Sequence, residues 1–143
     1  PGERHFTAQQ NSFLVRDVDF MIANIKSRQE QVADARSPGR FLGLDPEPRP
    51  SGKKGHIPGS VNLPYNLLME ADNNYVFRSA DEIKSVIQSA GITPEIPLVA
   101  TCGSGVTACV IALALYLVGY KDTAVYDGSW AEWGEHNATP VKN

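Results

Sequence analysis

The stretch of residues 97–118 constrains the fold of this chain more than any other part of the sequence. It begins with an apolar run at residues 97–101, passes through a glycine-containing loop at residues 102–106, and ends in a helical pattern at residues 107–118. A short and largely apolar strand that leads directly into a helix is typical of a parallel sheet covered by helices. The stretch therefore predicts an α/β fold.

The rest of the chain repeats this alternation of short apolar strands and amphipathic helices. Asp17 can cap one helix, and Ser79 and Glu82 have the spacing of a capping box at the start of another. Gly91 and Gly119 are placed to end helices. We predict strands at residues 13–15, 31–35, 61–63 and 124–126, a turn at residues 72–75, and a short helix capped by residues 127–129. The pattern predicts a central parallel sheet of about five strands with helices on both faces, and a ligand site at the carboxyl ends of the strands.

Length and composition favour one globular domain. The 143 residues are 42% hydrophobic and 20% charged, and the net charge of −3 argues against nucleic acid as a main partner. The longest apolar run, residues 108–118, is too short to span a membrane. Only two cysteines are present, which favours a reducing compartment over a disulfide framework. We predict a lead-in or interdomain linker at residues 1–12 and one domain at residues 13–143.

Cys102 is the expected reactive group. Gly103 and Gly105 follow it closely and allow backbone N–H groups to turn toward an anion, as in other anion-holding loops. The start of a helix also favours the thiolate, so we expect the pKa of Cys102 to be depressed. Cys109 lies within the apolar helix, where we expect it to face the core and to form no disulfide with Cys102. The cysteines and histidines show no metal-ligand spacing, and neither a metal nor a cofactor is expected.

The segment of residues 37–59 is rich in proline and glycine and is expected to form a long ordered loop or a lid over the site. Before it, Asp34 and Arg36 are interpreted as a structural ion pair. His56 is interpreted as a residue that fixes the loop. We interpret Trp130 and Trp133, near the carboxyl end of the chain, as core or domain-packing residues, and the alternative is that they line the mouth of the pocket.

Four motifs occur in an order that resembles the rhodanese-type sulfurtransferases, over nearly the whole chain. The motifs are Asp34-Ala35-Arg36, Gly55-His56-Ile57-Pro58-Gly59-Ser60-Val61-Asn62, the Cys102 loop, and Tyr126-Asp127-Gly128-Ser129-Trp130. The resemblance implies the rhodanese-like fold. It also implies that the Cys102 thiolate takes sulfur from a donor as a persulfide and passes it to a thiol, such as thioredoxin, or to cyanide.

The resemblance also implies roles for the residues around Cys102. Backbone N–H groups of Gly103, Gly105, Val106 and Thr107 would hold the persulfide. Ser104 would donate a hydrogen bond to a developing enolate, whereas the Thr107 hydroxyl is expected to cap the helix.

The substrate-anchoring residues are expected to come from residues 37–59. The neutral pair after Cys102 resembles the members of the family that use 3-mercaptopyruvate, since members that use thiosulfate tend to carry basic residues there. Arg40 and Arg49 resemble the arginines that bind the donor carboxylate in those members, and arginine presents a planar fork that matches a carboxylate.

The resemblance further implies that this domain is the second of a tandem pair. The first domain would then be a partner that completes the site, in a cytoplasmic or mitochondrial protein.

Three other functions compete with this interpretation. A cysteine phosphatase of similar architecture needs an arginine at the end of its loop, but Ala108 stands there and the helix offers no basic residue before Lys121. A thiosulfate-using sulfurtransferase would differ only in its donor. A non-catalytic rhodanese domain would serve as an interaction module, although such domains often lose the cysteine that this chain keeps.

Overall fold

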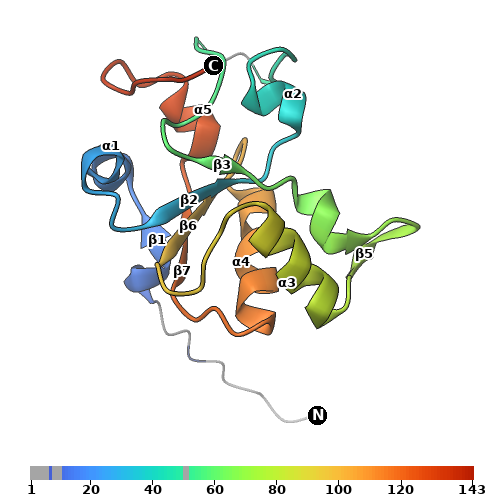
Figure 1. The fold of residues 1–143 in the computed structure, drawn as a ribbon. Helices are drawn as coiled ribbons and strands as arrows, with labels where there is room; N and C mark the ends of the chain where they lie inside the picture. Colours follow the sequence, from blue (N-terminus) through green and yellow to red (C-terminus); the bar gives the residue numbers. More distant parts are fainter. Residues whose placement is uncertain (1–6, 8–10, 50–51) are drawn as a thin grey trace.

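The computed structural model describes residue 7, residues 11–49 and residues 52–143. A five-stranded sheet with the order β1-β7-β6-β2-β3 lies at its centre, and every neighbouring pair of strands is parallel (Figure 1). This confirms the predicted α/β class and the central parallel sheet. The strands are β1 (Val15–Arg16), β2 (Gln31–Asp34), β3 (Val61–Asn62), β6 (Leu98–Thr101) and β7 (Thr123–Tyr126).

Helices cover both faces of the sheet, as the sequence pattern predicts. They are α1 (Val18–Ser27), α2 (Pro38–Phe41), α3 (Ala80–Ser89), α4 (Val106–Leu117) and α5 (Ser129–Trp133), with 3₁₀ turns at η1 (Ser12–Leu14) and η2 (Tyr65–Leu68). In Figure 1, α3 and α4 lie on one side of the sheet and α1 lies on the other.

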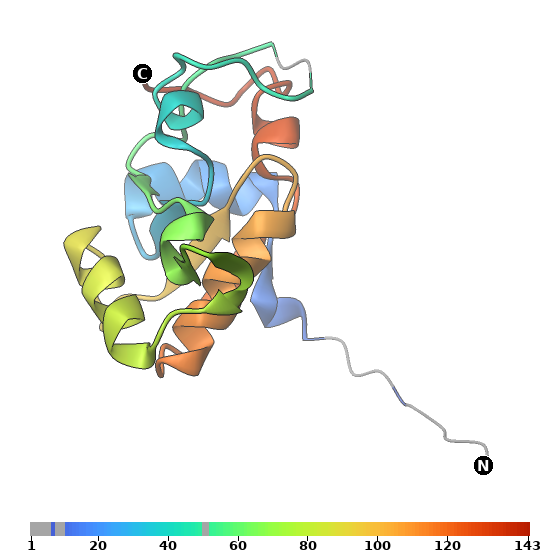
Figure 2. The same ribbon diagram turned by 90° about the vertical axis from the view of Figure 1, so that its right-hand side faces the viewer.

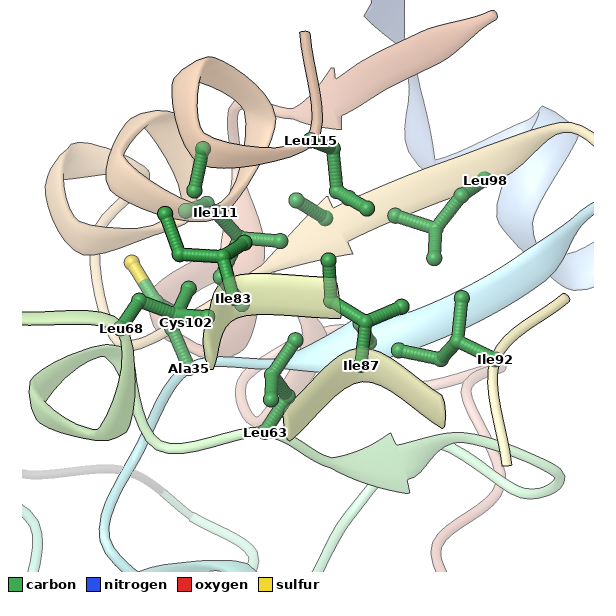
Figure 3. Packing of buried hydrophobic residues seen from close by; sticks show 14 residues of the cluster. Ala35, Leu63, Leu68, Ile83, Ile87, Ile92, Leu98, Cys102, Ile111 and Leu115 are labelled. Atoms are coloured by element: carbon green, nitrogen blue, oxygen red, sulfur yellow. The ribbon is translucent and has the colours of Figure 1, made fainter. Parts of the chain in front are cut away.

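Two separate hydrophobic clusters fill the space on the two faces. The larger cluster joins Ile83 and Ile87 of α3 to Ile111 and Leu115 of α4, and Figure 3 shows Cys102 at one end of it. The smaller cluster contains Met21, Val32, Ile57, Val99, Tyr126, Trp130 and Trp133. The interpretation of both tryptophans as packing residues is therefore confirmed.

Local signals in the sequence placed most helix ends correctly. The Asp17 side chain accepts a hydrogen bond from the Phe20 N–H at 2.8 Å, and Ser79 and Glu82 form the full capping box. Gly91 and Gly119 have φ values of +77° and +98°, which is the left-handed conformation that ends many helices at glycine.

Two other expectations, the strand at residues 13–15 and the turn at residues 72–75, were wrong. Residues 12–14 form the turn η1, and the strand is confined to Val15–Arg16 because Phe13 is 83% exposed and has no sheet face to bury. The turn predicted at residues 72–75 is part of an antiparallel hairpin of β4 (Met69–Glu70) and β5 (Asn73–Phe77). The segment 37–59 contains the short helix α2. Most of the predicted lead-in, residues 1–12, lies outside the described residues.

Cys109 is also not where we expected it. Cys109 is exposed on α4, although the sequence pattern led us to expect it in the core. The helix is apolar on almost every side, so periodicity could not decide which face is buried. The Cys109 thiol donates to the Gly105 carbonyl at 3.4 Å.

Candidate active site

Cys102 follows the last residue of β6, at the carboxyl edge of the sheet, and the loop after it leads into α4. This is the edge at which parallel α/β sheets bind ligands. Figure 2 shows α5 beside this loop. Cys102 is 2% exposed, so its sulfur lies at the inner end of the loop.

Gly105 is required by the geometry of the loop. It precedes the first residue of α4 with φ +86°, a conformation that other residues rarely adopt. A Cβ atom at this position would lie 2.8 Å from the Asp127 carbonyl oxygen. The glycine therefore allows the loop to turn into α4 while it packs against the end of β7.

The surroundings of the Cys102 sulfur favour its thiolate form. Burial alone would raise the pKa of the thiol. Hydrogen bonds from the Thr107 hydroxyl and from the Ser104 and Ala108 N–H groups outweigh burial, and Ser129 adds a weaker one, so the pKa lies below its usual value. This is the depressed pKa that the sequence predicted.

Residues at the start of α5 hold the first two peptide groups of the loop. The Ser129 hydroxyl accepts from the Cys102 N–H at 3.1 Å and donates to the Tyr126 carbonyl at 2.8 Å. The Trp130 N–H donates to the Cys102 carbonyl, and the Ala131 N–H donates to the Gly103 carbonyl, each at 2.9 Å. Because these bonds use both carbonyls, the peptide groups that precede α4 are fixed in orientation.

Ser129 has a role that the sequence did not reveal. It is fully buried and has φ +50°, which is strained for a residue other than glycine. We expected residues 127–129 to cap α5, but Gly128 precedes the helix and no side chain caps it. The signal available in the sequence was a serine in the motif with Tyr126, and nothing in its spacing indicated contact with Cys102.

A pocket of about 360 Å³ lies above the cysteine loop and brings together most of the predicted site residues. Cys102, Gly103, Ser104, Val106 and Thr107 line one part of it. Arg40, Glu47, Pro48 and Arg49, from the segment 37–59, line another part. Trp130 and Ala131 of α5 complete the lining. Gly105 does not line the pocket and acts through the shape of the loop.

The loop side chains differ in their exposure and contacts. Ser104 is exposed, and Val106 is 71% exposed at the start of α4. Thr107 does not cap the helix as we expected, because Gly105 occupies the N-cap and Thr107 is already the second residue of α4. Its hydroxyl is instead directed to the Cys102 sulfur.

An ion-pair network supports the pocket wall that carries the two arginines. Arg36, whose side chain is fully buried, binds Asp34 at 2.7 Å and Glu47 at 2.7 Å, and its guanidinium lies 4.2 Å from the Trp130 ring centre. Burial would lower the pKa of Arg36, but hydrogen bonds and ion pairs with the two carboxylates raise it. The interpretation of Asp34 and Arg36 as a structural pair is confirmed.

Arg40 and Arg49 differ in what they contact. Arg40 donates through Nε and Nη2 to the Glu47 carboxylate, while Arg49 is exposed and makes no ion pair with any residue that the structure describes. His56 is buried, stacks on Phe41 at 3.8 Å, and lies 2.9 Å from the Phe41 carbonyl through Nδ1. Its expected role in fixing the loop is confirmed.

Within the described ranges, no group of three or more histidine, cysteine or acidic residues could hold a metal ion. The same part of the chain contains no helix whose length and apolar character would let it cross a membrane.

Known proteins are similar in sequence to most of this chain. Residues 17–136 match the family model of the Rhodanese-like domain. The human 3-mercaptopyruvate sulfurtransferase is 43% identical over 133 residues, which cover 93% of this chain and 44% of that protein. The rat thiosulfate sulfurtransferase is also 43% identical, over 134 residues that cover 93% of this chain and 44% of that protein. The chain thus spans less than half the length of these relatives.

Solved structures agree with the sequence comparisons. The Tum1 protein from Saccharomyces cerevisiae superposes with a TM-score of 0.81 at 32% identity, over 92% of this chain and 47% of that chain. The 3-mercaptopyruvate sulfotransferase SseA from Escherichia coli superposes with a TM-score of 0.73 at 30% identity, over 88% of this chain and 45% of that chain.

Proposed function

The chain belongs to the Rhodanese-like domain family, and we propose that it transfers sulfur from 3-mercaptopyruvate to a thiol or cyanide through a persulfide on Cys102. One observation carries the proposal. A buried cysteine with a lowered pKa shares a pocket with two arginines, Arg40 and Arg49. A thiolate near cationic groups is suited to attack the sulfur of a donor that carries a carboxylate.

In the first step, the Cys102 thiolate attacks the sulfur of 3-mercaptopyruvate. A sulfur–sulfur bond forms while the carbon–sulfur bond of the donor breaks. The electron pair of the broken bond passes to carbon as the pyruvate enolate, which is then protonated. Ser104, which is exposed and lines the pocket, would donate a hydrogen bond to the enolate oxygen. Such a donor acts where charge develops during the reaction.

The persulfide forms on Cys102 as –S–SH, and loss of its proton to solvent leaves an anion that needs hydrogen-bond donors. The loop from Gly103 to Thr107 supplies N–H groups, and the Thr107 hydroxyl adds a further donor. In the second step, an acceptor thiolate or cyanide attacks the outer sulfur. The sulfur–sulfur bond breaks, its electron pair returns to Cys102, and the thiolate is regenerated. Splitting one transfer into two steps is the usual advantage of a covalent intermediate.

The donor carboxylate is the reason to favour 3-mercaptopyruvate over thiosulfate. Arg49 is the arginine without an ion pair to a described residue, and it can bind a carboxylate that lies away from the reacting sulfur. Gly103 and Ser104 are uncharged, and the Arg40 guanidinium beside Gly103 is paired with Glu47, whereas a compact dianion would gain most from an unpaired cation beside Cys102. The thiosulfate reaction is the second candidate, supported by the rat relative named for it.

Partners and location are also part of the proposal. Because the relatives are more than twice as long as the matched region, we propose that another rhodanese-like domain of the same protein covers the pocket. A thiol protein such as thioredoxin is the proposed acceptor, in the cytoplasm or the mitochondrion.

Turnover of the two donors tests the proposal. We expect pyruvate release from 3-mercaptopyruvate with a kcat/KM above that for thiosulfate, and loss of both activities in Cys102→Ser. Cys109→Ser is the matched control, because this exposed thiol lies outside the pocket lining, and it should keep full activity. Sulfur transfer that survives Cys102→Ser would contradict the proposal. No transfer from either donor by the wild-type chain would favour an interaction module.

A further inference from the structure

Glu47 links Arg40, which lies beside the cysteine loop, to the buried Asp34–Arg36 ion pair at the end of β2. One of its carboxylate oxygens accepts from Arg36 Nη1 at 2.7 Å, and the other accepts from Arg40 Nε at 3.1 Å and from Arg40 Nη2. The Glu47 side chain is 10% exposed, whereas that of Arg40 is 23% exposed. A carboxylate in such surroundings is a fixed point of attachment for Arg40, because Arg36 is itself anchored on Asp34.

The position of Arg40 depends on this attachment. Its Nη2 atom would lie 2.6 Å from a Cβ atom at position 103, so the guanidinium occupies the space that a side chain would fill beside Gly103. Glu47 therefore places a cation against the first residue after Cys102. A neutral side chain at position 47 would leave Arg40 free to move among the conformations open to a long side chain.

Glu47 also sets the charge of the pocket. Arg40 and Arg49 each contribute one positive charge to the lining, and Glu47 contributes one negative charge. Apart from Cys102 the lining carries one net positive charge, and the Cys102 thiolate brings the total to zero. Without the Glu47 carboxylate the total would be positive, so Glu47 removes the excess of positive charge that would favour a dianion such as thiosulfate over a donor with one carboxylate.

We propose that Glu47 is a positioning residue that fixes Arg40 against Gly103 and determines specificity by limiting the positive charge that the pocket offers to donors with two negative charges. The inference rests on the proposed function for the identity of the donors. The effect of the Glu47 charge on reagents at Cys102 does not depend on the proposed function, because any anionic reagent that approaches Cys102 experiences the same field.

The test compares Glu47→Gln, which removes the charge, with Glu47→Asp, which keeps the charge but shortens the reach. Glu70→Gln is the matched control, since this exposed carboxylate lies in the β4–β5 hairpin outside the pocket lining. Two reagents probe the charge at Cys102: iodoacetate, which is an anion, and iodoacetamide, which is neutral. Taking the ratio of their alkylation rates cancels changes in thiolate fraction, and Cys109→Ser serves as the background for every variant.

In Glu47→Gln, we expect the iodoacetate-to-iodoacetamide ratio to rise about two- to fivefold, the effect of one unit charge at a distance of several ångströms in partly solvated surroundings. The ratio of kcat/KM for thiosulfate to that for 3-mercaptopyruvate should rise by a similar factor. Glu47→Asp should leave the alkylation ratio unchanged and raise the KM for 3-mercaptopyruvate at least threefold, with kcat within twofold. Glu70→Gln should change none of these values.

An alkylation ratio in Glu47→Gln within the scatter of the Glu70→Gln control would overturn the inference. If Glu47→Gln does not fold, the Glu47→Asp variant decides, and an unchanged KM overturns the inference. A wild-type chain that transfers no sulfur from either donor contradicts the proposed function alone, since the alkylation ratio still reports the charge of Glu47.

Discussion

The cysteine loop and the segment 37–59 form two walls of the same pocket, but a different kind of group holds the shape of each wall. Backbone groups hold the cysteine loop, which we call the backbone wall. Gly105 turns the chain, and the carbonyls of Cys102 and Gly103 accept hydrogen bonds from N–H groups of α5. Charged side chains hold the segment 37–59, which we call the side-chain wall, since Glu47 joins Arg40 to the buried Arg36. The comparison suggests that one wall carries the chemistry and the other selects the donor.

The strongest way to break the side-chain wall is Arg36→Met. The substitution leaves the buried Asp34 carboxylate without its cation, and we expect a loss of about 3–5 kcal/mol in the free energy of unfolding. Urea denaturation measures it. Arg16→Met is the matched control, because the Arg16–Glu30 pair is partly exposed and its loss should cost about 1 kcal/mol or less. Equal losses in the two variants would contradict a central role for the buried network.

The strongest way to break the backbone wall is Gly105→Ala. The positive φ and the close Asp127 carbonyl together should cost about 2–4 kcal/mol of stability. Activity should fall further than stability predicts, because the N–H groups around the Cys102 sulfur lose their alignment. Gly91→Ala separates these effects, since it has φ +77° with no atom within 4 Å of the new Cβ atom and does not line the pocket. A Gly105→Ala variant with wild-type activity would show that the loop shape is not required.

The sequence was most informative about the backbone wall. A strand, a cysteine, two glycines and an apolar helix follow one another within residues 97–118, so local patterns alone located the loop and its reactive group. The α/β class followed from the same kind of local pattern repeated along the chain. These features are set by residues close in sequence, which propensity and periodicity can detect.

The sequence was less informative where distant residues meet. Ser129 contacts Cys102 across 27 positions of the chain, and its left-handed backbone has no sequence signal. Nothing in the local sequence around Glu47, which lies between two prolines, indicates its role. Its two arginine partners become its neighbours only when the chain folds. The exposure of Cys109 was missed since both faces of α4 are apolar, and only the packing of α4 against β6, β7, η2 and α3 decides which face is buried.

A smaller effect is expected from Thr107→Val, which tests whether a side chain also contributes to the backbone wall. Removing the hydroxyl takes away a hydrogen bond that lowers the pKa of Cys102, so the pKa of this thiol should rise. The rate of alkylation by iodoacetamide measured against pH reports this shift. Because less thiolate is present at low pH, the variant should be slowest relative to wild type below the wild-type pKa and similar above both pKa values. Thr93→Val, in a loop outside the site, should leave the profile unchanged.

The smallest effect is expected from Arg49→Ala, which removes the exposed cation of the side-chain wall. We expect the KM for 3-mercaptopyruvate to rise about fivefold to tenfold, which corresponds to a charge-assisted contact of about 1–1.4 kcal/mol in partly solvated surroundings. The KM for thiosulfate should change less. Steady-state kinetics with both donors measures the difference, and Arg28→Ala provides a matched exposed arginine outside the pocket. Equal changes for both donors would contradict a carboxylate-binding role.

The intact mass of the chain after exposure to 3-mercaptopyruvate is the most direct test of the persulfide on Cys102. The account predicts that the wild-type chain and Cys109→Ser each gain one sulfur atom, that a thiol acceptor removes it, and that Cys102→Ser gains none. A wild-type chain whose mass does not change, or sulfur that still attaches in Cys102→Ser, would contradict the account.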